Sequence, residues 1–308
     1  MAKIFIDGSA GTTGLRILER LSKDPDLKVL IIEGDARKDV NARKRAINEC
    51  DVAFLCLPDD AARESVSLLE NPEVTVIDTS TAHRTAEGWV YGFPEIKGQR
   101  ELIKGSERIA NPGCHASGFI ALVRPFTDAG IISPETFLSC YSLTGFSGGG
   151  KKMIAEYSDP AKKEALESPR LYGLTQQHKH LKEMAKMSML EKLPAFVPVV
   201  APFYSGMTVS VALDLQGLGI SKNDAENVLA EYYENEKLVR FMGDISEEGF
   251  LASSGMKGLD SMEVYVYGND ERVILVSRFD NLGKGASGAA IQNMNISLGR
   301  DELTSLIF

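Results

Sequence analysis

Short apolar runs alternate with segments of helical periodicity over the first eighty positions of the chain. The apolar runs predict strands at residues 3–7, 28–33, 51–57 and 74–78. The periodic segments between them predict helices at residues 13–21, 40–48 and 59–69. Asp59 or Asp60 is expected to cap the third helix. Strands and helices in this order predict a parallel sheet with helices on both faces.

After Gly113 the pattern changes to longer strands mixed with helices. Strands are expected at residues 136–143, 196–200, 208–215, 262–268 and 272–279. Helices are expected at residues 115–129, 179–190, 222–233 and 288–298. The whole chain is therefore expected to be α/β: a Rossmann-like dinucleotide-binding domain followed by an α+β domain with an open mixed sheet.

Length and composition agree with two domains and exclude several classes of protein. The 308 residues suffice for two hydrophobic cores, and 44% hydrophobic with 25% charged residues is ordinary for a soluble protein. A net charge of -9 argues against nucleic acid or an anionic membrane as the main partner. No apolar run approaches the ~20 residues that span a bilayer, and no signal peptide is visible, so we expect a cytoplasmic protein.

A glycine-rich turn follows the first predicted strand and opens the first predicted helix. Its sequence is Gly8-Ser9-Ala10-Gly11-Thr12-Thr13-Gly14. Glycine lets the backbone approach a pyrophosphate, and the N–H groups at the helix start then face the anion. A G-x-x-G-x-x-G spacing alone also fits a structural turn, but its position between strand and helix favours dinucleotide binding.

The choice between NAD and NADP is expected to depend on residues after the second strand. Glu33 would hold a ribose 2′-hydroxyl, whereas Arg37 and Lys38 would accept a 2′-phosphate. A solvated charged loop is the alternative interpretation. The two cations favour NADP.

Cys114 is the candidate nucleophile. It follows Asn111-Pro112-Gly113, in which proline and glycine interrupt regular secondary structure immediately before a predicted helix. The N–H groups and dipole at a helix start favour a thiolate, which attacks activated acyl groups. The alternative, a buried structural thiol, is expected for Cys50, Cys56 and Cys140, which lie in or beside apolar runs. The four cysteines do not suggest a disulfide framework or contain a C-x-x-C motif, so a redox protein is not expected.

A histidine is needed as proton carrier, and the sequence contains only four. His178 and His180 precede a helical segment, and one of them is expected to be the acid–base group. His115 is adjacent to Cys114, but neighbours on a helix point in different directions. A polar turn or a metal pair is the alternative for His178 and His180. No third ligand stands out, so we expect no metal.

Two further segments suit an anionic substrate. Residues 78–84 follow a strand end, where ligands bind in open α/β sheets, and Arg84 is suited to a bidentate grip on phosphate. Residues 144–151, which include Ser147, offer backbone N–H groups and a lysine. They fit an anion cradle, a mobile lid or a plain flexible loop. Arg170 and Tyr172 are weaker candidates for binding a substrate carboxylate.

Five segments together resemble the shorter form of the N-acetyl-gamma-glutamyl-phosphate reductases, which are related to aspartate-semialdehyde dehydrogenases. They are the glycines at positions 8, 11 and 14, residues 57–62 (LPDDAA), 111–114 (NPGC), 172–180 (YGLTQQHKH) and 280–286 (DNLGKGA). The resemblance covers nearly the whole chain. It implies NADPH-dependent reduction of N-acetyl-L-glutamyl 5-phosphate to N-acetyl-L-glutamate 5-semialdehyde, in arginine biosynthesis, through a cysteine thioester.

The resemblance also implies roles for individual residues. It assigns the nucleophile to Cys114 and the acid–base histidine to the 178/180 pair. Arg84 and Asn111 would bind phosphate, and the turn that begins at Asn281 would lie beside the nicotinamide. Residues 1–114, completed by a C-terminal helix at 283–308, would bind the dinucleotide. Residues 115–282 would bind substrate and form a homo-oligomer.

Two positions depart from the family pattern. His115 occupies a place where tyrosine is more usual. Ser205-Gly206-Met207 stands where the aspartate enzymes carry Arg-Gly-His, which disfavours aspartyl phosphate as the substrate. A reductase of another acyl phosphate remains the alternative within this class, and a catalytically silent dinucleotide-binding sensor is the alternative outside it.

Overall fold

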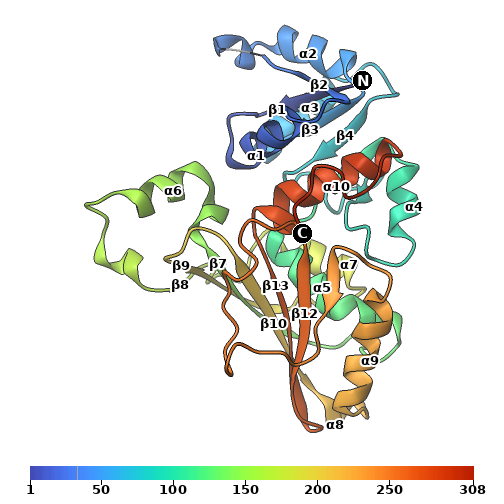
Figure 1. Cartoon of the computed structure of the whole chain (residues 1–308), viewed down its shortest axis with the longest axis vertical. Helices are drawn as coiled ribbons and strands as arrows, with labels where there is room; N and C mark the ends of the chain where they lie inside the picture. Colours follow the sequence, from blue (N-terminus) through green and yellow to red (C-terminus); the bar gives the residue numbers. More distant parts are fainter. Residues whose placement is uncertain (33) are drawn as a thin grey trace. The chain divides into compact units, whose positions relative to one another are not determined.

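The computed structural model describes residues 1–32 and 34–308, which divide into two compact units (Figure 1). The first unit comprises Met1–Gly113 and Ala286–Ile307. The second comprises Cys114–Gly285 together with Phe308. Both divisions lie close to the expected domain boundaries, and Cys114 is the first residue of the second unit.

The first unit is built on a six-stranded sheet in the order β2-β1-β3-β4-β6-β5, with every neighbouring pair parallel. Its strands are β1 (Ala2–Asp7), β2 (Leu27–Leu30), β3 (Val52–Leu55), β4 (Thr75–Asp78), β5 (Val90–Tyr91) and β6 (Arg108–Ala110). Its helices are α1 (Thr12–Leu21), α2 (Val40–Glu49), α3 (Asp59–Ser67), α4 (Gln99–Lys104) and α10 (Gly288–Ser297). The predicted parallel sheet is therefore confirmed.

Alternate residues of the central strands feed two cores, one on each face of this sheet. Ile4 and Ile6 of β1 pack with residues of α1 and α10. Phe5, between them in the sequence, packs on the other face with Ile47 of α2 and Ala62 of α3. Each core is buried, so helices cover both faces, as the continuous apolar strands require.

Two local predictions in this unit were wrong. Pro58 occupies the N-cap of α3, and both aspartates lie inside the first turn. The carboxylate of Asp59 instead accepts hydrogen bonds from the backbone and side chain of Thr81. Strand β2 spans Leu27–Leu30 and does not include residues 31 and 32 of the predicted strand, and a short 3₁₀ segment follows at Gly34–Lys38.

The second unit contains a seven-stranded mixed sheet in the order β11-β12-β13-β10-β7-β9-β8. Its strands are β7 (Ser139–Gly145), β8 (Arg170–Leu171), β9 (Ala195–Ala201), β10 (Met207–Asp214), β11 (Val239–Phe241), β12 (Met262–Gly268) and β13 (Arg272–Phe279). Its helices are α5 (Cys114–Asp128), α6 (Gly150–Ser158), α7 (Leu181–Met187), α8 (Leu215–Leu218) and α9 (Lys222–Tyr233). The predicted bounds of α9, β12 and β13 agree with the structure.

Helix α5 lies directly on β10 and β13, and α7 and α9 pack beside it. Its approach to the sheet is close because position 118 is glycine. A Cβ at Gly118 would lie 2.4 Å from a methyl carbon of Val209 and 2.7 Å from Ser277 Oγ. Tyr141 and Ile274 are 45% and 49% exposed, so the sheet also presents apolar side chains to solvent.

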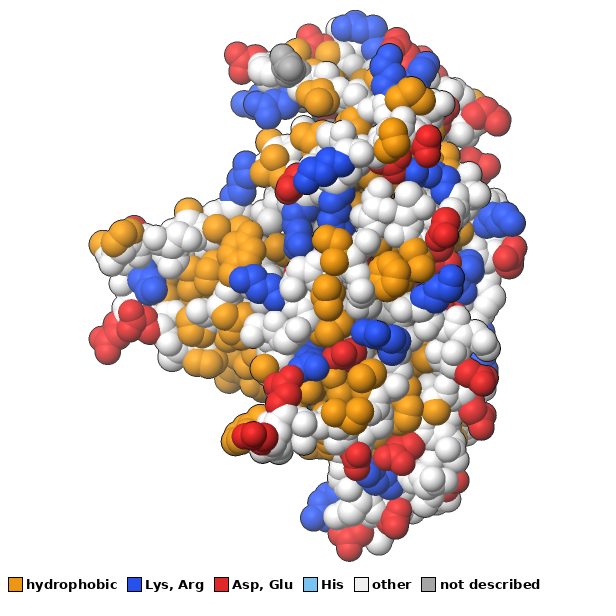
Figure 2. Space-filling model, viewed as in Figure 1, with side chains coloured by type: hydrophobic (Ala, Val, Ile, Leu, Met, Phe, Trp, Pro, Cys, Tyr) orange, Lys and Arg blue, Asp and Glu red, His pale blue; other side chains and the backbone are white. Residues whose placement is uncertain are grey.

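On the face of the molecule shown in Figure 2, acidic and basic side chains are mixed with one another. Hydrophobic side chains gather over the part of the second unit that Figure 1 labels β7, β8 and β9. Within the residues that the structure describes, no helix has the length and apolar character needed to cross a bilayer.

Candidate functional site

The glycine turn has the backbone geometry that a dinucleotide requires. Gly8 adopts φ +87°, and a Cβ there would lie 2.3 Å from the carbonyl oxygen of Cys56. A Cβ at Gly14 would lie 2.5 Å from the carbonyl oxygen of Gly8. Helix α1 begins at Thr12 without a side-chain cap, so its first-turn N–H groups are available to an anion. Glycine is therefore sterically required at positions 8 and 14.

A cavity of about 560 Å³ opens beside this turn. It brings together four of the predicted cofactor residues, namely Gly8, Ser9, Arg37 and Lys38. Arg37 and Lys38 are exposed, and Arg37 donates from Nε to the carbonyl oxygen of Gly34. Glu33, the predicted ribose ligand, lies outside the described residues. The cavity thus combines a backbone that a ligand can approach closely with two cations, a lining suited to an anionic ligand.

Arg43 also lines this cavity, although the sequence analysis did not single it out. Its Nε donates to Asp7 at 3.0 Å, and its Nη1 donates to Glu64 at 2.7 Å. The hydrogen bond to Glu64 and the charge of Asp7 raise the pKa of Arg43, despite burial, which acts in the opposite direction. Helical periodicity gave no signal for this residue, because a polar helix face looks the same whether solvent or a carboxylate faces it.

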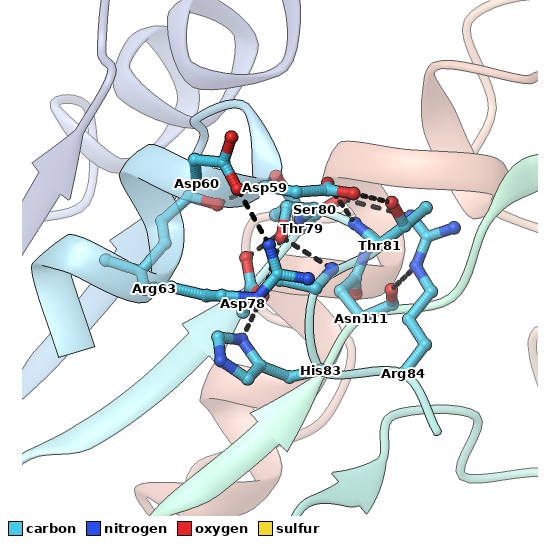
Figure 3. Close-up of polar contacts among 12 residues, drawn as sticks. Asp59, Asp60, Arg63, Asp78, Thr79, Ser80, Thr81, His83, Arg84 and Asn111 are labelled. Atoms are coloured by element: carbon cyan, nitrogen blue, oxygen red, sulfur yellow. Dashed lines mark hydrogen bonds and ion pairs between the residues drawn. The ribbon is translucent and has the colours of Figure 1, made fainter. Parts of the chain in front are cut away.

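The segment after β4 is held by a buried carboxylate (Figure 3). Asp78 accepts hydrogen bonds from the backbone N–H of Ser80 at 2.9 Å and from its hydroxyl at 2.8 Å. His83 Nδ1 lies 2.6 Å from the same carboxylate, and the His83 ring stacks on Trp89 with centroids 4.1 Å apart. The four contacts fix the course of the chain that leads to Arg84.

Arg84 and Asn111, the predicted phosphate ligands, are next to each other in the first unit (Figure 3). Arg84 donates to the carbonyl oxygens of Asn111 at 2.9 Å and Thr79 at 3.1 Å. The Asn111 side chain is buried, donates to the carbonyl oxygen of Ala286 and accepts from Asn293. Both side chains therefore also hold the backbone of this unit together.

Cys114 is the first residue of α5, as expected, and its side chain is partly exposed. Gly285 leaves it this space: a Cβ at position 285 would lie 2.8 Å from the Cβ of Cys114. The 280–286 motif therefore returns beside the candidate nucleophile within the second unit. Gly285 was not singled out in the sequence, and the expected position of this turn beside the nicotinamide stays a prediction.

The other three cysteines are less suited to attack. Burial raises the pKa of Cys50 and Cys56 to about 12, and burial also raises the pKa of Cys140 far above its usual range. All four thiols are free. At neutral pH these three are protonated and therefore poor nucleophiles.

Three histidines and a tyrosine gather near the start of α5. The ring of His115 lies 5.8 Å from His178 and 5.5 Å from His180, and the latter two rings are 4.7 Å apart. His115 Nε2 lies 2.6 Å from the hydroxyl of Tyr172. His180 Nε2 is 3.8 Å from a carboxylate oxygen of Glu183. The structure thus adds His115 and Tyr172 to the predicted histidine pair.

Burial sets the protonation of this cluster. Burial, helped by the charge of His178, lowers the pKa of His115 to about 3, so its ring is neutral. Burial, helped by the negative charge of Cys114, raises the pKa of Tyr172 well above its usual range. Tyr172 therefore keeps its proton and is close enough to Cys114 to sense its charge.

The turn that carries Tyr172 and the histidine pair is fixed to β9. Tyr172 donates its backbone N–H to the carbonyl oxygen of Pro198. The side chain of Gln176 accepts from the N–H of Phe196 at 2.8 Å and donates to its carbonyl oxygen at 2.7 Å. Gly173 adopts φ +62°, which allows the turn. Such pairing explains how a polar segment without regular structure holds its side chains in place.

Ser147 and Asn281 meet, although the sequence analysis gave them different ligands. Asn281 Nδ2 donates to Ser147 Oγ at 3.0 Å, and its Oδ1 accepts from the N–H of Gly206 at 2.9 Å. Ser147 is buried in a 3₁₀ turn, Phe146–Gly149, that leads into α6. A plain flexible loop, one of the three interpretations offered for this segment, is therefore wrong.

Arg170 lies on β8, near the same end of the sheet. Its Nη2 donates to the hydroxyl of Tyr157 at 2.9 Å, and its guanidinium lies 5.4 Å from the centroid of that ring. Nε of Arg170 is buried and makes no hydrogen bond within the part of the chain that the structure describes. A buried donor in this condition is costly, and a carboxylate ligand would satisfy it.

Comparison with protein families gives two matches that together span most of the chain. Residues 3–105 match the NAD binding domain of semialdehyde dehydrogenase. Residues 114–281 match the semialdehyde dehydrogenase dimerisation domain. The boundary between the two matches coincides with the division between the two compact units.

Similar curated proteins cover almost the full length. An N-acetyl-gamma-glutamyl-phosphate reductase 2 of Nostoc sp. is 45% identical over 97% of this chain and 98% of its own. An N-acetyl-gamma-glutamyl-phosphate reductase of Brucella anthropi is 45% identical over 97% of this chain and 99% of its own.

Similar solved structures support the fold. Aspartate semialdehyde dehydrogenase II of Vibrio cholerae superposes with a TM-score of 0.70 at 16% identity, covering 97% of this chain and 98% of its own. Aspartate semialdehyde dehydrogenase of Candida albicans, solved with NADP, gives 0.67 at 16% identity, covering 96% and 98%.

Proposed function

The chain belongs to the semialdehyde dehydrogenase family, among the N-acetyl-gamma-glutamyl-phosphate reductases, and is therefore an oxidoreductase. From this premise we propose that it reduces N-acetyl-L-glutamyl 5-phosphate to N-acetyl-L-glutamate 5-semialdehyde with NADPH, in arginine biosynthesis. One observation carries the proposal at the site: a partly exposed cysteine at the start of α5 with a histidine cluster nearby. The 45% identity to the named reductases carries the choice of substrate.

The first unit fits a dinucleotide with a 2′-phosphate. The turn at Gly8 would hold the pyrophosphate, because a side chain there would fill the space. Arg37 and Lys38 line the same cavity and would bind the 2′-phosphate. When bound, NADPH supplies the hydride for reduction of the acyl group.

Cys114 would act as the covalent nucleophile. Its thiolate attacks the carbonyl carbon of the acyl phosphate, a carbon–sulfur bond forms, and the carbon–oxygen bond to phosphate breaks with release of inorganic phosphate. Transfer of a hydride to the resulting thioester gives a thiohemiacetal. Cleavage of its carbon–sulfur bond releases the aldehyde and returns the thiolate. The N–H groups of the first turn of α5 favour the anionic sulfur.

His178 or His180 would carry the proton in this cycle. One of them protonates the oxygen anion of the thiohemiacetal and removes that proton again as the aldehyde departs. Their rings are in contact with each other and with neutral His115, and His180 also faces Glu183. Glu183 would orient the His180 ring, and either histidine of the pair remains a candidate for the acid–base role.

The substrate offers two anionic groups for recognition. Arg84 and Asn111 are proposed to bind the phosphate. They would do so through side-chain N–H groups other than those that donate to the local backbone. Arg170 is proposed to bind the carboxylate, since its buried Nε would then gain an acceptor. Ser147 and Asn281 are proposed to hold the substrate-binding segment 144–151 in place rather than to bind ligand directly, because they bond to each other.

The proposed function is tested in the reverse direction with N-acetylglutamate semialdehyde, phosphate and NADP. Cys114→Ser should retain NADP binding and lose nearly all turnover, since a neutral hydroxyl does not replace the thiolate. Cys50→Ser is the matched control, because that thiol is buried and hydrogen-bonded to the carbonyl of Ile47. Substantial turnover by Cys114→Ser would falsify the thioester scheme, and faster oxidation of aspartate semialdehyde would change the substrate.

The match to a dimerisation domain supports a homo-oligomer formed through the second unit. Its sheet exposes Tyr141 and Ile274, which would be covered in such an assembly. Light scattering on the purified protein should give a multiple of the 33.6 kDa chain mass. We also propose a cytoplasmic location, because four free thiols suit a reducing compartment.

A further inference from the structure

A chain of hydrogen bonds leads from the sheet to the Tyr172 hydroxyl through His115. His115 Nδ1 lies 2.6 Å from Ser142 Oγ on β7, and its Nε2 lies 2.6 Å from the Tyr172 hydroxyl. His115 is 3% exposed and Ser142 is fully buried. The ring therefore has fixed partners on both sides, and it follows Cys114 directly on α5.

Satisfaction of hydrogen bonds fixes the direction of this chain. A neutral imidazole has one N–H, so it donates to one hydroxyl and accepts from the other. Among the described residues, His115 is the only hydrogen-bond partner of Ser142 Oγ. If Ser142 accepted from Nδ1, its own buried proton would have no acceptor, which costs about 1–3 kcal/mol. Ser142 is completely buried, whereas Tyr172 is only half-buried, so an unsatisfied proton costs more on the serine. Ser142 therefore donates to Nδ1, and the ring proton lies on Nε2.

Tyr172 is oriented by its bond to His115. His115 Nε2 donates to the phenolic oxygen, which leaves the phenol proton for another acceptor. Among the described residues, the hydroxyl has no second hydrogen-bond partner. Tyr172 lies close enough to Cys114 for the sulfur charge to act on it. An anionic oxygen on a group bound to Cys114 is the acceptor that this proton lacks.

We propose that His115 is a positioning residue: Ser142 fixes its tautomer, and its Nε2–H holds Tyr172 with the phenol proton directed toward the oxygen anion formed at Cys114. Tyr172 thereby acts as a catalytic hydrogen-bond donor. The inference rests on the thioester chemistry proposed above. It explains how histidine serves at position 115, since both ring nitrogens are used.

Ser142→Ala is the sharpest test, because Ser142 lies behind the imidazole and does not face the substrate. Without the serine donor the tautomer is no longer fixed, so the ring populates a second form that carries its proton on Nδ1. In that form Nε2 accepts from Tyr172 and the phenol proton points away from the reaction. A donor to a developing oxyanion is typically worth about 10²–10³-fold in kcat, so Tyr172→Phe should lose about that much. Ser142→Ala should also lower kcat, while its KM should stay within about twofold of the wild-type value. Ser277→Ala, another buried serine of the same sheet, is the control.

The double variant Ser142→Ala/Tyr172→Phe separates positioning from general damage. It should be no slower than Tyr172→Phe alone, because both changes remove the same donor. His115→Gln should rescue most of the activity that His115→Leu loses, since an amide can donate to Tyr172. Wild-type kcat in Ser142→Ala, or losses that multiply in the double variant, overturns the inference. Failure of the proposed function is distinct, because the wild-type protein would then show no phosphate-dependent turnover.

Discussion

Acidification should destabilise this protein through His115. The ring is buried against Ser142 and Tyr172 and faces His178, His180 and the carboxylate beyond them. Its pKa is lowered from 6.5 to about 3, chiefly by burial. In the unfolded chain the ring binds a proton below pH 6.5, whereas in the folded protein it stays unprotonated down to about pH 3. Stability therefore falls as pH falls through this window.

The size of the effect follows from the two pKa values. One pKa unit corresponds to about 1.36 kcal/mol, so the folded state should lose about 2 kcal/mol between pH 7 and pH 5 from this group. Other groups titrate in the same range, and a matched variant removes their contribution. His115→Gln keeps a neutral hydrogen-bonding side chain but cannot bind the proton.

Urea unfolding followed by circular dichroism, at pH 7, 6 and 5, measures the difference. The wild-type midpoint should fall further than that of His115→Gln, with similar m-values, by an amount equal to about 2 kcal/mol at pH 5. Parallel loss of stability in both proteins would show that His115 carries a proton in the native state at pH 5. The proposal that a neutral His115 donates its Nε2–H to Tyr172 would then be wrong.

Three further predictions concern the cofactor cavity and the surroundings of the thiol. The pair Arg37→Ala/Lys38→Ala should raise KM for NADPH about 10-fold or more and leave KM for NADH nearly unchanged, because it removes charge-assisted bonds to the 2′-phosphate; equal changes would argue against their role. Gly285→Ala places a Cβ 2.8 Å from the Cβ of Cys114, so it should slow both turnover and alkylation and cost about 1–3 kcal/mol by thermal melting. Asn281→Ala breaks two hydrogen bonds made by a buried side chain, so it should lower the free energy of urea unfolding by about 1–3 kcal/mol, and an unchanged midpoint would contradict the structural role.

Local patterns alone identified most of the elements that position the site. The glycine turn requires a specific backbone geometry, which Gly8 adopts with φ +87°. Pro112 and Gly113 interrupt regular structure before a long apolar helix, so Cys114 was expected at or next to the start of that helix, and it is the first residue of α5. Periodicity predicted helix α9 with the bounds that the structure shows, and in the structure a capping box between Ser221 and Asp224 stabilises its start. Each of these signals operates within a few residues of chain.

Short or polar segments were not identified in this way. Strands β5 and β8 have two residues each, too few for a periodicity to show. Helix α6 follows a run of glycines, and its start is decided by the 3₁₀ turn in which Ser147 is buried against Asn281. The contact spans 134 positions, so nothing local encodes it.

The amino-acid sequence by itself indicated the class of chemistry: a dinucleotide turn, a candidate nucleophilic thiol at a helix start, and histidines proposed to carry a proton. Only the tertiary structure decided which polar groups meet. His115 reaches Ser142 and Tyr172, 27 and 57 positions away, because α5 lies on the sheet and the 172–180 turn is pinned to β9. Periodicity tells which face of an element is buried, but hydrogen-bond partners depend on how distant elements align. The sequence left the role of His115 open. The alignment of distant elements places its ring between Ser142 and Tyr172.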